Sequence, residues 1–402
     1  MYEKLKMTAN PNEGSFVKTL TGRTGTGFQE GTHVHKDWYA RTLSYEQGLE
    51  MAENAARERE DLLIPVKNIS GNVNNDNQFV FKIEDNGSRE FVPTDHALEQ
   101  FSTRIGVPSS TILRELRGQE DSDLVDADIM ARIANNSLRR MNQDKVFRLR
   151  TYTDGTCRAF VSDRYAPVDN RWYLETLKEF LPEGRLSHWR GDEDTIYGNI
   201  LLPDSIIDYG TDDDSDYGGM ISVGNCEIGK RVISQKPSLF RSICMNGCIW
   251  GQVVGKQIRK RHIGNIDLDF LKMEIGSNIQ EQLPLLPTGI TTFLETRNLN
   301  TNLDSIKGII ATISKNEKLR KVEASEIFNQ YHAYESHERN LFGVVNAVTR
   351  AGQRFNNDRW LKFDEIGGNL INLNQNGWNS LLRQSSYLEQ KDFDKVFGVL
   401  SL

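Results

Sequence analysis

The sequence predicts an α+β protein with a central antiparallel β-sheet built from hairpins, backed by a helix, and with helical N-terminal and C-terminal flanks. Three observations lead to this fold class. Short runs rich in β-branched and aromatic residues occur in pairs around turn signals in the middle of the chain. The last third has helical composition and few helix breakers. No internal repeat points to a solenoid or a propeller.

The first 140 residues are expected to form two regions. Residues 1–60 read as an extended, partly helical arm, with helical composition over 43–60. Residues 61–140 read as a small strand pair over 62–71 and 78–93, followed by a helical hairpin. Thr94 or Asp95 can cap the first helix of this hairpin, and Gly106 ends it.

The region 141–264 is predicted to hold the antiparallel core, with hairpins over 145–163, 184–203 and 218–235. Pro237 suits the first turn of a helix, and such a helix carries a stripe of small and apolar residues. The stripe consists of Leu239, Phe240, Ile243, Cys244 and Gly247. The region 265–402 is predicted to be helical, over 266–283, 302–352 and 377–388.

The chain has a formal net charge of −7, which argues against indiscriminate binding to nucleic acid. The charge is unevenly placed, however. Between Gly218 and Ile266 the only acidic residue is Glu227, and basic residues are concentrated there. They are Lys230, Arg231, Lys236, Arg241, Lys256, Arg259, Lys260 and Arg261. Because nucleic-acid affinity depends on basic side chains that neutralise phosphates, this segment is a candidate binding site.

Further candidates lie on or near the hairpins. Four more arginines could contact phosphate, and two aromatic residues could stack on bases of a single strand. They are Arg148, Arg150, Arg158, Arg164, Tyr165 and Trp189. Six aspartates occur directly upstream, between Pro203 and Gly219, and are expected to form an exposed loop. This loop could compete with nucleic acid for the basic residues, hold a cation or contact a partner.

Two other kinds of site receive less support. Ser102, Gly106 and Val107, followed by Thr111, Ile112 and Arg114, have the spacing of a helix-turn-helix unit, but an ordinary helical hairpin also explains them. Cys226, Cys244, Cys248 and His262 lack the paired knuckles of a structural zinc site. His332 and His337 do not have the spacing of a metallopeptidase motif. We therefore predict no metal, no cofactor and no catalytic residues.

The cellular setting follows from composition. The first residues have no positive region followed by an apolar stretch, so we expect no secretory signal. The chain has four cysteines, and no apolar run is long enough for a membrane-spanning helix. We expect a cytoplasmic protein with reduced thiols and no membrane partner.

The runs "SDRYAPVDN" and "GNCEIG…PSLFRSICMNG", within residues 91–264, resemble a protein family of phages and plasmids catalogued as a domain of unknown function. The resemblance implies a mobile-element setting and no specific chemistry. Phages often encode proteins that bind or anneal single strands as rings or filaments. We therefore expect a homo-oligomeric protein of a bacterial host that binds single-stranded DNA in replication or recombination. The alternatives are an assembly protein that oligomerises through acidic and basic segments, and a metal-dependent enzyme of unrecognised type.

Overall fold

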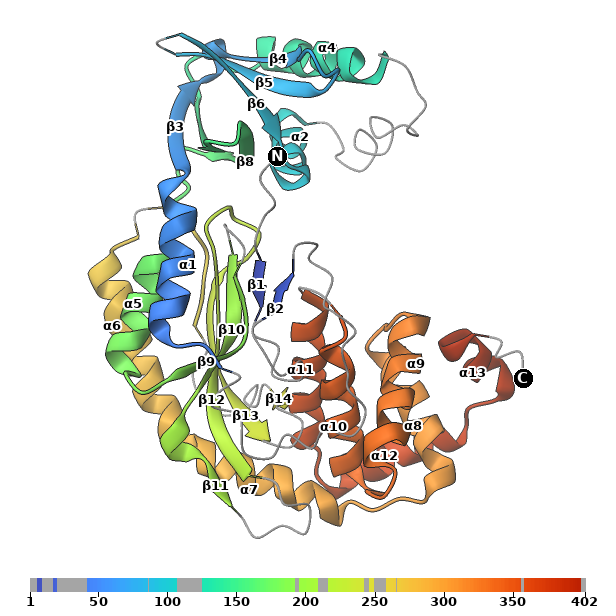
Figure 1. Ribbon diagram of the computed structural model, residues 1–402. Helices are drawn as coiled ribbons and strands as arrows, with labels where there is room; N and C mark the ends of the chain where they lie inside the picture. The colour runs from blue at the N-terminus through green and yellow to red at the C-terminus, as the bar shows by residue number, and fades with distance from the viewer. Residues whose placement is uncertain are drawn as a thin grey trace.

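Two β-sheets and a C-terminal group of helices make up the protein (Figure 1). The computed structural model describes residues 6–8, 17–19, 42–85, 87–106, 125–191, 195–208, 216–241, 246–248, 258–264, 266–355 and 358–398. The combination of sheets and helices confirms the α+β class.

The smaller sheet has six strands in the order β3-β7-β8-β6-β5-β4. Their bounds are Arg59–Pro65 (β3), Ile69–Val73 (β4), Phe79–Glu84 (β5), Ser88–Pro93 (β6), Val146–Tyr152 (β7) and Thr156–Ser162 (β8). The pairing of β6 with β8 is parallel, whereas the others are antiparallel. Helices α2 (Asp95–Ile105) and α4 (Val125–Arg139) pack against this sheet.

Phenylalanine rings fill the core of this smaller unit. The ring of Phe160 on β8 lies 5.0 Å from Phe101 on α2, 4.8 Å from Phe147 on β7 and 5.3 Å from Phe81 on β5, centroid to centroid. Such edge and tilted contacts between buried rings stabilise a core beyond the burial of their area. They fix α2 on the sheet, and α2 forms part of the candidate site described below.

The larger sheet has nine strands, and all of their pairings are antiparallel. Seven strands follow the order β14-β13-β12-β10-β9-β1-β2, while β11 pairs with β12 and β15 with β13. The bounds are Lys6–Thr8 (β1), Val17–Thr19 (β2), Arg185–Gly191 (β9), Thr195–Leu201 (β10), Ile207–Asp208 (β11), Asp216–Cys226 (β12), Ile233–Arg241 (β13), Asn246–Cys248 (β14) and Ile258–Lys260 (β15).

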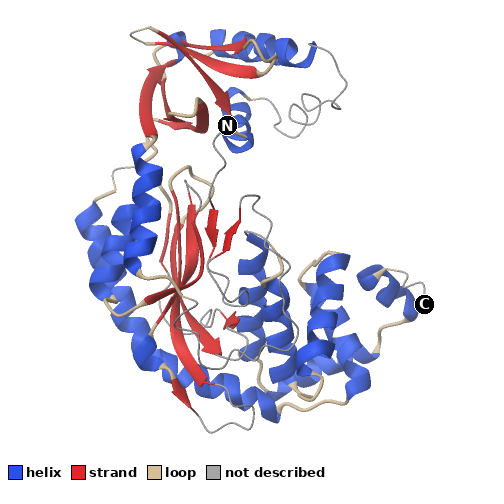
Figure 2. Cartoon of the chain, in the orientation of Figure 1, coloured by secondary structure: helices blue, strands red, loops and turns tan. Residues whose placement is uncertain are grey.

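The two faces of the larger sheet differ, because successive side chains on a strand point to opposite sides. One face is apolar and carries Ile196, Ile221, Val223 and Ile233. Helices α1 (Tyr45–Arg57), α5 (Asn170–Phe180) and α6 (Leu268–Gln282) cover it, as Figure 2 shows. The intervening positions carry Tyr197, Ser222, Ser234 and Lys236, so the opposite face is polar there.

Local signals explain two of these covering helices. Ser44 caps α1 in a reciprocal capping box with Gln47, and the Asp267 carboxylate accepts from the first backbone N–H groups of α6. The sequence analysis did not identify α5. Its buried residues Tyr173, Leu174 and Leu177 have helical spacing, which was the available signal.

Helices also form the C-terminal region, as predicted. They are α7 (Leu286–Glu295), α8 (Leu303–Asn316), α9 (Lys321–Gln330), α10 (Leu341–Gly352), α11 (Asp358–Ile371), α12 (Gln375–Ser386) and α13 (Gln390–Phe397). A π-helical turn, Tyr331–Glu335, follows α9. Buried side chains such as Ile309, Val345 and Phe363 pack these helices together.

The helix predicted at Pro237 is wrong, because this segment is strand β13. On its outer edge, β13 pairs with β15 through residues 233–235 and with β14 through residues 239–241. Pro237 lies between these two stretches and pairs with Ile221 of β12. A proline is tolerated in a strand where its missing N–H is not required by a neighbouring strand.

The hairpin of β7 and β8 also differs from expectation. The sequence analysis grouped residues 141–162 with the central sheet, but β7 pairs with β3, and β8 pairs with β6. These strands therefore belong to the smaller sheet. The β6–β8 pairing is parallel and joins segments more than sixty residues apart, so hairpin signals alone do not reveal it.

Candidate anion-binding pocket

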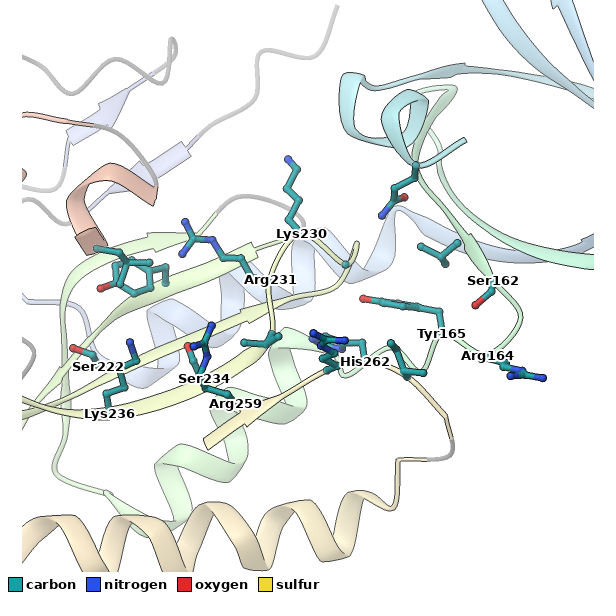
Figure 3. Close-up of a pocket in the computed structure, with 18 of the residues that line it drawn as sticks. Ser162, Arg164, Tyr165, Ser222, Lys230, Arg231, Ser234, Lys236, Arg259 and His262 are labelled. Atoms are coloured by element: carbon teal, nitrogen blue, oxygen red, sulfur yellow. The ribbon is translucent and has the colours of Figure 1, made fainter. Parts of the chain in front are cut away.

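A pocket of about 590 Å³ lies where the smaller sheet meets the polar face of the larger one (Figure 3). The end of β8 and the residues after it form one wall, and α2 contributes Gln100 and Arg104. The turn between β12 and β13 and the exposed side of β15 form the next part. Leu361 and Glu365 on α11 close the other end.

The turn between β12 and β13 is held by groups from α2, α5 and β3. Gln100 Nε2 donates to the carbonyl oxygen of Ile228 at 2.8 Å. The Glu227 carboxylate is buried and accepts from the backbone N–H of Asn170 at 2.6 Å and from the Arg59 guanidinium. Gly229 has a φ of +77°, a left-handed conformation that favours glycine. This anchored turn places Lys230 at the pocket with its side chain exposed.

Strand alternation determines which basic residues of β15 reach the pocket. Arg259 pairs in register with Ser234 of β13, and both line the pocket. Lys260 points to the opposite face, where its ammonium group lies 2.6 Å from the carboxylate of Glu274 on α6. Arg261, two positions after Arg259, lines the pocket again. The Arg-Lys-Arg run is therefore divided between two faces of the sheet.

The described residues that line the pocket include seven basic side chains and one carboxylate. The basic ones are Arg104, Arg164, Lys230, Arg231, Lys236, Arg259 and Arg261, and the carboxylate is that of Glu365. Like charges collected in a concave site with low-dielectric walls produce a strong positive potential. The pocket therefore attracts anions although the whole chain is acidic.

Five of these seven cations form no ion pair with a described residue. No carboxylate in the described part of the chain forms an ion pair with Lys230, Arg259 or Arg261, and the same holds for Arg104 and Arg164. Arg231 lies with its guanidinium 5.6 Å from the centre of the Tyr197 ring. The ammonium group of Lys236, by contrast, pairs with the carboxylate of Glu365. The cations without an ion pair provide most of the attraction for an anion, because a carboxylate partner cancels much of the positive potential of a paired cation.

Burial shifts the ionisation of other pocket residues. Burial lowers the pKa of His262 to about 4, against a weaker opposing effect of its Nδ1 contact with the Ala166 carbonyl oxygen at 3.3 Å. The imidazole is therefore neutral at pH 7 and adds no charge. Burial also lowers the pKa of Arg104, which stays far above neutrality because an arginine remains protonated in proteins.

Tyr165 lines the pocket but was wrongly expected to offer a face to a base. Its side chain is buried, with 8% exposed. The ring lies 5.5 Å from the His262 ring at an interplanar angle of 21°, and the hydroxyl donates to the Cys226 carbonyl oxygen. Tyr165 thus supports the wall of the pocket and holds His262 in place.

Several predicted phosphate contacts are already paired elsewhere. Arg150 is buried and makes two 2.8 Å hydrogen bonds to the Asp61 carboxylate, which also pairs with Arg148. Arg158 is buried against the Tyr152 ring and pairs with Asp154. Arg241 is buried at the C-terminal helices, where it pairs with Glu335. Nearby carboxylates neutralise these arginines. None of these arginines lines the pocket, and neither does Lys260.

Other predictions fall outside what the structure describes. Lys256 and Cys244 lie beyond the described residues, as do the second helix of the predicted hairpin and Asp212 to Asp214. Trp189 is part of β9 and Cys248 of β14, but their side chains are not described. Conversely, the sequence analysis missed Arg104, because only the packing of α2 against the β12–β13 turn brings it to the pocket.

The remaining Cys and His candidates have ordinary environments. Cys226 is buried and accepts from Thr195 Oγ1 at 3.2 Å. His332 and His337 are exposed on the surface. Within the ranges that the structure describes, no three His, Cys, Asp or Glu side chains group as metal ligands. Among the same residues, no helix is both long and apolar enough to cross a bilayer.

The fold and the pocket together define an α+β protein with a cationic site between two β-sheets. A scan against protein-family models, a search of curated proteins and a search of solved structures each found no match. The resemblance to the phage and plasmid family therefore stays a prediction.

Proposed function

We propose that this protein binds single-stranded nucleic acid, most simply DNA during replication or recombination of a mobile element, and that the cationic pocket holds the phosphates. The observation that carries the proposal is that seven basic side chains, from segments far apart in the chain, line one pocket in which a single carboxylate is described. Binding and annealing of strands require positioning and charge neutralisation, so the proposal assigns no catalytic step.

A single strand suits the pocket better than a duplex. Its volume of about 590 Å³ accommodates nucleotide-sized groups rather than a double helix. Single-strand sites combine a positive groove with apolar surfaces for bases. Here Ile263 lines the pocket and is 63% exposed, so it provides apolar surface at the rim.

The proposal is tested by titrating labelled single-stranded and duplex oligonucleotides at several salt concentrations. For the variant Arg259→Ala/Arg261→Ala we expect weaker binding, because two phosphate contacts are lost. The slope of log K against log salt should become shallower by roughly 1.4, at about 0.7 per contact on a single strand.

Lys260→Ala is the matched control, because this lysine is next to both arginines in sequence but faces α6. It should leave the salt slope nearly unchanged. If Lys260→Ala weakens oligonucleotide binding as much as the single variants Arg259→Ala and Arg261→Ala do, net charge alone determines binding. If no oligonucleotide binds the native protein, the proposal is wrong.

The proposal places the protein in the cytoplasm of a bacterial host. Homo-oligomerisation, expected from the analogy with strand-annealing proteins, remains part of the proposal. Light scattering with and without oligonucleotide measures it directly. Assemblies that dissolve in high salt, together with an absence of oligonucleotide binding, would favour the assembly-protein alternative.

A further inference from the structure

The end of the pocket at α11 differs chemically from the rest. Figure 3 shows Ser222 and Lys236 at one end and Arg164 and Tyr165 at the other. Ser222 and Lys236 are opposite each other in the β12–β13 register. Leu361 and Glu365 also line the pocket; they are one helical turn apart on α11 and therefore project from the same side of it. This end therefore combines an aliphatic group, a hydroxyl, and a carboxylate that is paired with the Lys236 ammonium group.

The Glu365 carboxylate is held in place but keeps acceptor capacity. Its Oε1 accepts from Lys236 Nζ, while Oε2 has no partner among the described residues. The side chain is 38% exposed, so a ligand can reach it. An ionised carboxylate has two oxygens with about four acceptor positions and no donor.

The helix that carries Glu365 is fixed on both sides. The Trp360 ring meets the Tyr197 ring edge-on at 5.3 Å, which attaches α11 to the larger sheet. Arg359 donates to both carboxylate oxygens of Glu323 on α9, at 2.7 and 2.6 Å. Glu365 thus occupies a defined position, as a residue that recognises a ligand requires.

A carboxylate repels phosphate but complements hydrogen-bond donors. We propose that the α11 end of the pocket is a nucleobase subsite, in which Glu365 accepts hydrogen bonds from the amino and ring N–H groups of a base. The phosphates of the same strand lie against Arg259, Arg261 and Lys230. This inference rests on the proposed function and adds a base preference to it: bases with an exocyclic amine bind better than thymine.

The preference is measured by titrating the full-length protein with labelled deoxycytidine and deoxythymidine homopolymers of equal length. The amino group of cytosine donates hydrogen bonds that a carboxylate accepts, whereas thymine has a single ring N–H donor. We expect the native protein to bind the cytidine polymer about five- to tenfold more tightly. In Glu365→Gln this ratio should fall towards one, because the amide also donates to the thymine carbonyl groups.

Glu274→Gln is the matched control, since Glu274 also pairs with a lysine but lies on α6, outside the pocket. It should keep the native ratio. If Glu365→Gln tightens both polymers equally, Glu365 acts only through its charge and the base subsite is refuted. A ratio that stays at the native value in Glu365→Gln also refutes it. In either case, salt-dependent binding of the polymers still supports the proposed function. If neither polymer binds the native protein, the proposed function and the base subsite are both wrong.

Discussion

The environment of each basic residue determines whether it contributes to the pocket. Arg259 and Arg261 face the pocket, and Lys260 between them pairs with Glu274. The three have similar charge and consecutive positions, yet only two are available to an anion there. An exposed pair such as Lys260–Glu274 adds little stability, because water screens it. Lys260 is absent from the site because strand alternation points it to the opposite face.

His262 provides a prediction at the residue scale. Burial lowers its folded-state pKa to about 4, whereas an unfolded histidine has a pKa of about 6.5. Between these values the unfolded state binds a proton that the folded state does not, so stability increases with pH. As the pH falls from about 6.5 to about 4, His262 should reduce the free energy of unfolding by up to about 1.4 kcal/mol per pH unit.

Chemical denaturation of the native protein and of His262→Gln across this pH range isolates the effect. Other titrating groups contribute to both proteins and cancel in the difference. The difference in unfolding free energy should change within the window and be flat from pH 7 upwards. A constant difference over the whole range would show that His262 titrates normally in the folded protein.

At the scale of elements, the β12–β13 hairpin is the central part of the site. Hydrogen bonds from Gln100 and from the groups around Glu227 hold its turn in place. Lys230 and Arg231 follow directly in the chain and line the pocket. The strands themselves carry Ser222, Ser234 and Lys236 to the pocket. Binding groups on paired strands are positioned more rigidly than groups on a loop.

Gly229→Ala tests the importance of this turn. Gly229 has a φ of +77°, and an added Cβ would lie 3.3 Å from the Tyr165 ring. A left-handed alanine costs about 1–2 kcal/mol, so we expect that loss in the free energy of unfolding. We also expect weaker oligonucleotide binding, because the turn that presents Lys230 is distorted. Denaturation and the salt titration measure the two effects.

Gly155→Ala is the control for this variant. Gly155 has a φ of +79° in the β7–β8 turn, has open space around it and does not line the pocket. Gly155→Ala should lose about as much free energy of unfolding as Gly229→Ala, while its oligonucleotide binding stays at the native level. If both variants bind oligonucleotide like the native protein, the conformation of the β12–β13 turn is not important for binding.

At the scale of the whole molecule, the pocket depends on how the two sheets meet. A buried network joins them: Arg150 on β7 donates to the Glu227 carbonyl oxygen at 3.0 Å, and Arg59 pairs with Glu227 and Asp169. Removing one partner of a buried pair leaves an uncompensated charge, so such networks favour a single arrangement. Arg150 of β7 and Arg59 of β3 therefore organise the site from outside it.

Because both sheets contribute cations, a bound strand should contact both. Arg104→Ala/Arg164→Ala removes two charges on the side of the smaller sheet. We expect the salt slope to become shallower by roughly 1.4, as for the pair on β15. The same titration measures it.

Arg139→Ala/Arg140→Ala is a suitable control, since both arginines are exposed at the end of α4 and do not line the pocket. An unchanged slope for Arg104→Ala/Arg164→Ala would restrict the binding site to the larger sheet.

The sequence by itself determined the α+β class, helix α1, the capped helix α2, the hairpins and the basic segment, because these follow from local periodicity, turn residues and composition. Lys230, Arg231, Lys236, Arg259, Arg261 and Arg164 were all among its candidates and line the pocket. Only the tertiary structure decided that Arg150 and Arg241 are neutralised, that Arg104 joins the site, and that Pro237 lies in a strand. The physical reason is that charge pairing and strand neighbours depend on residues distant in the chain, and no local pattern records which of them meet.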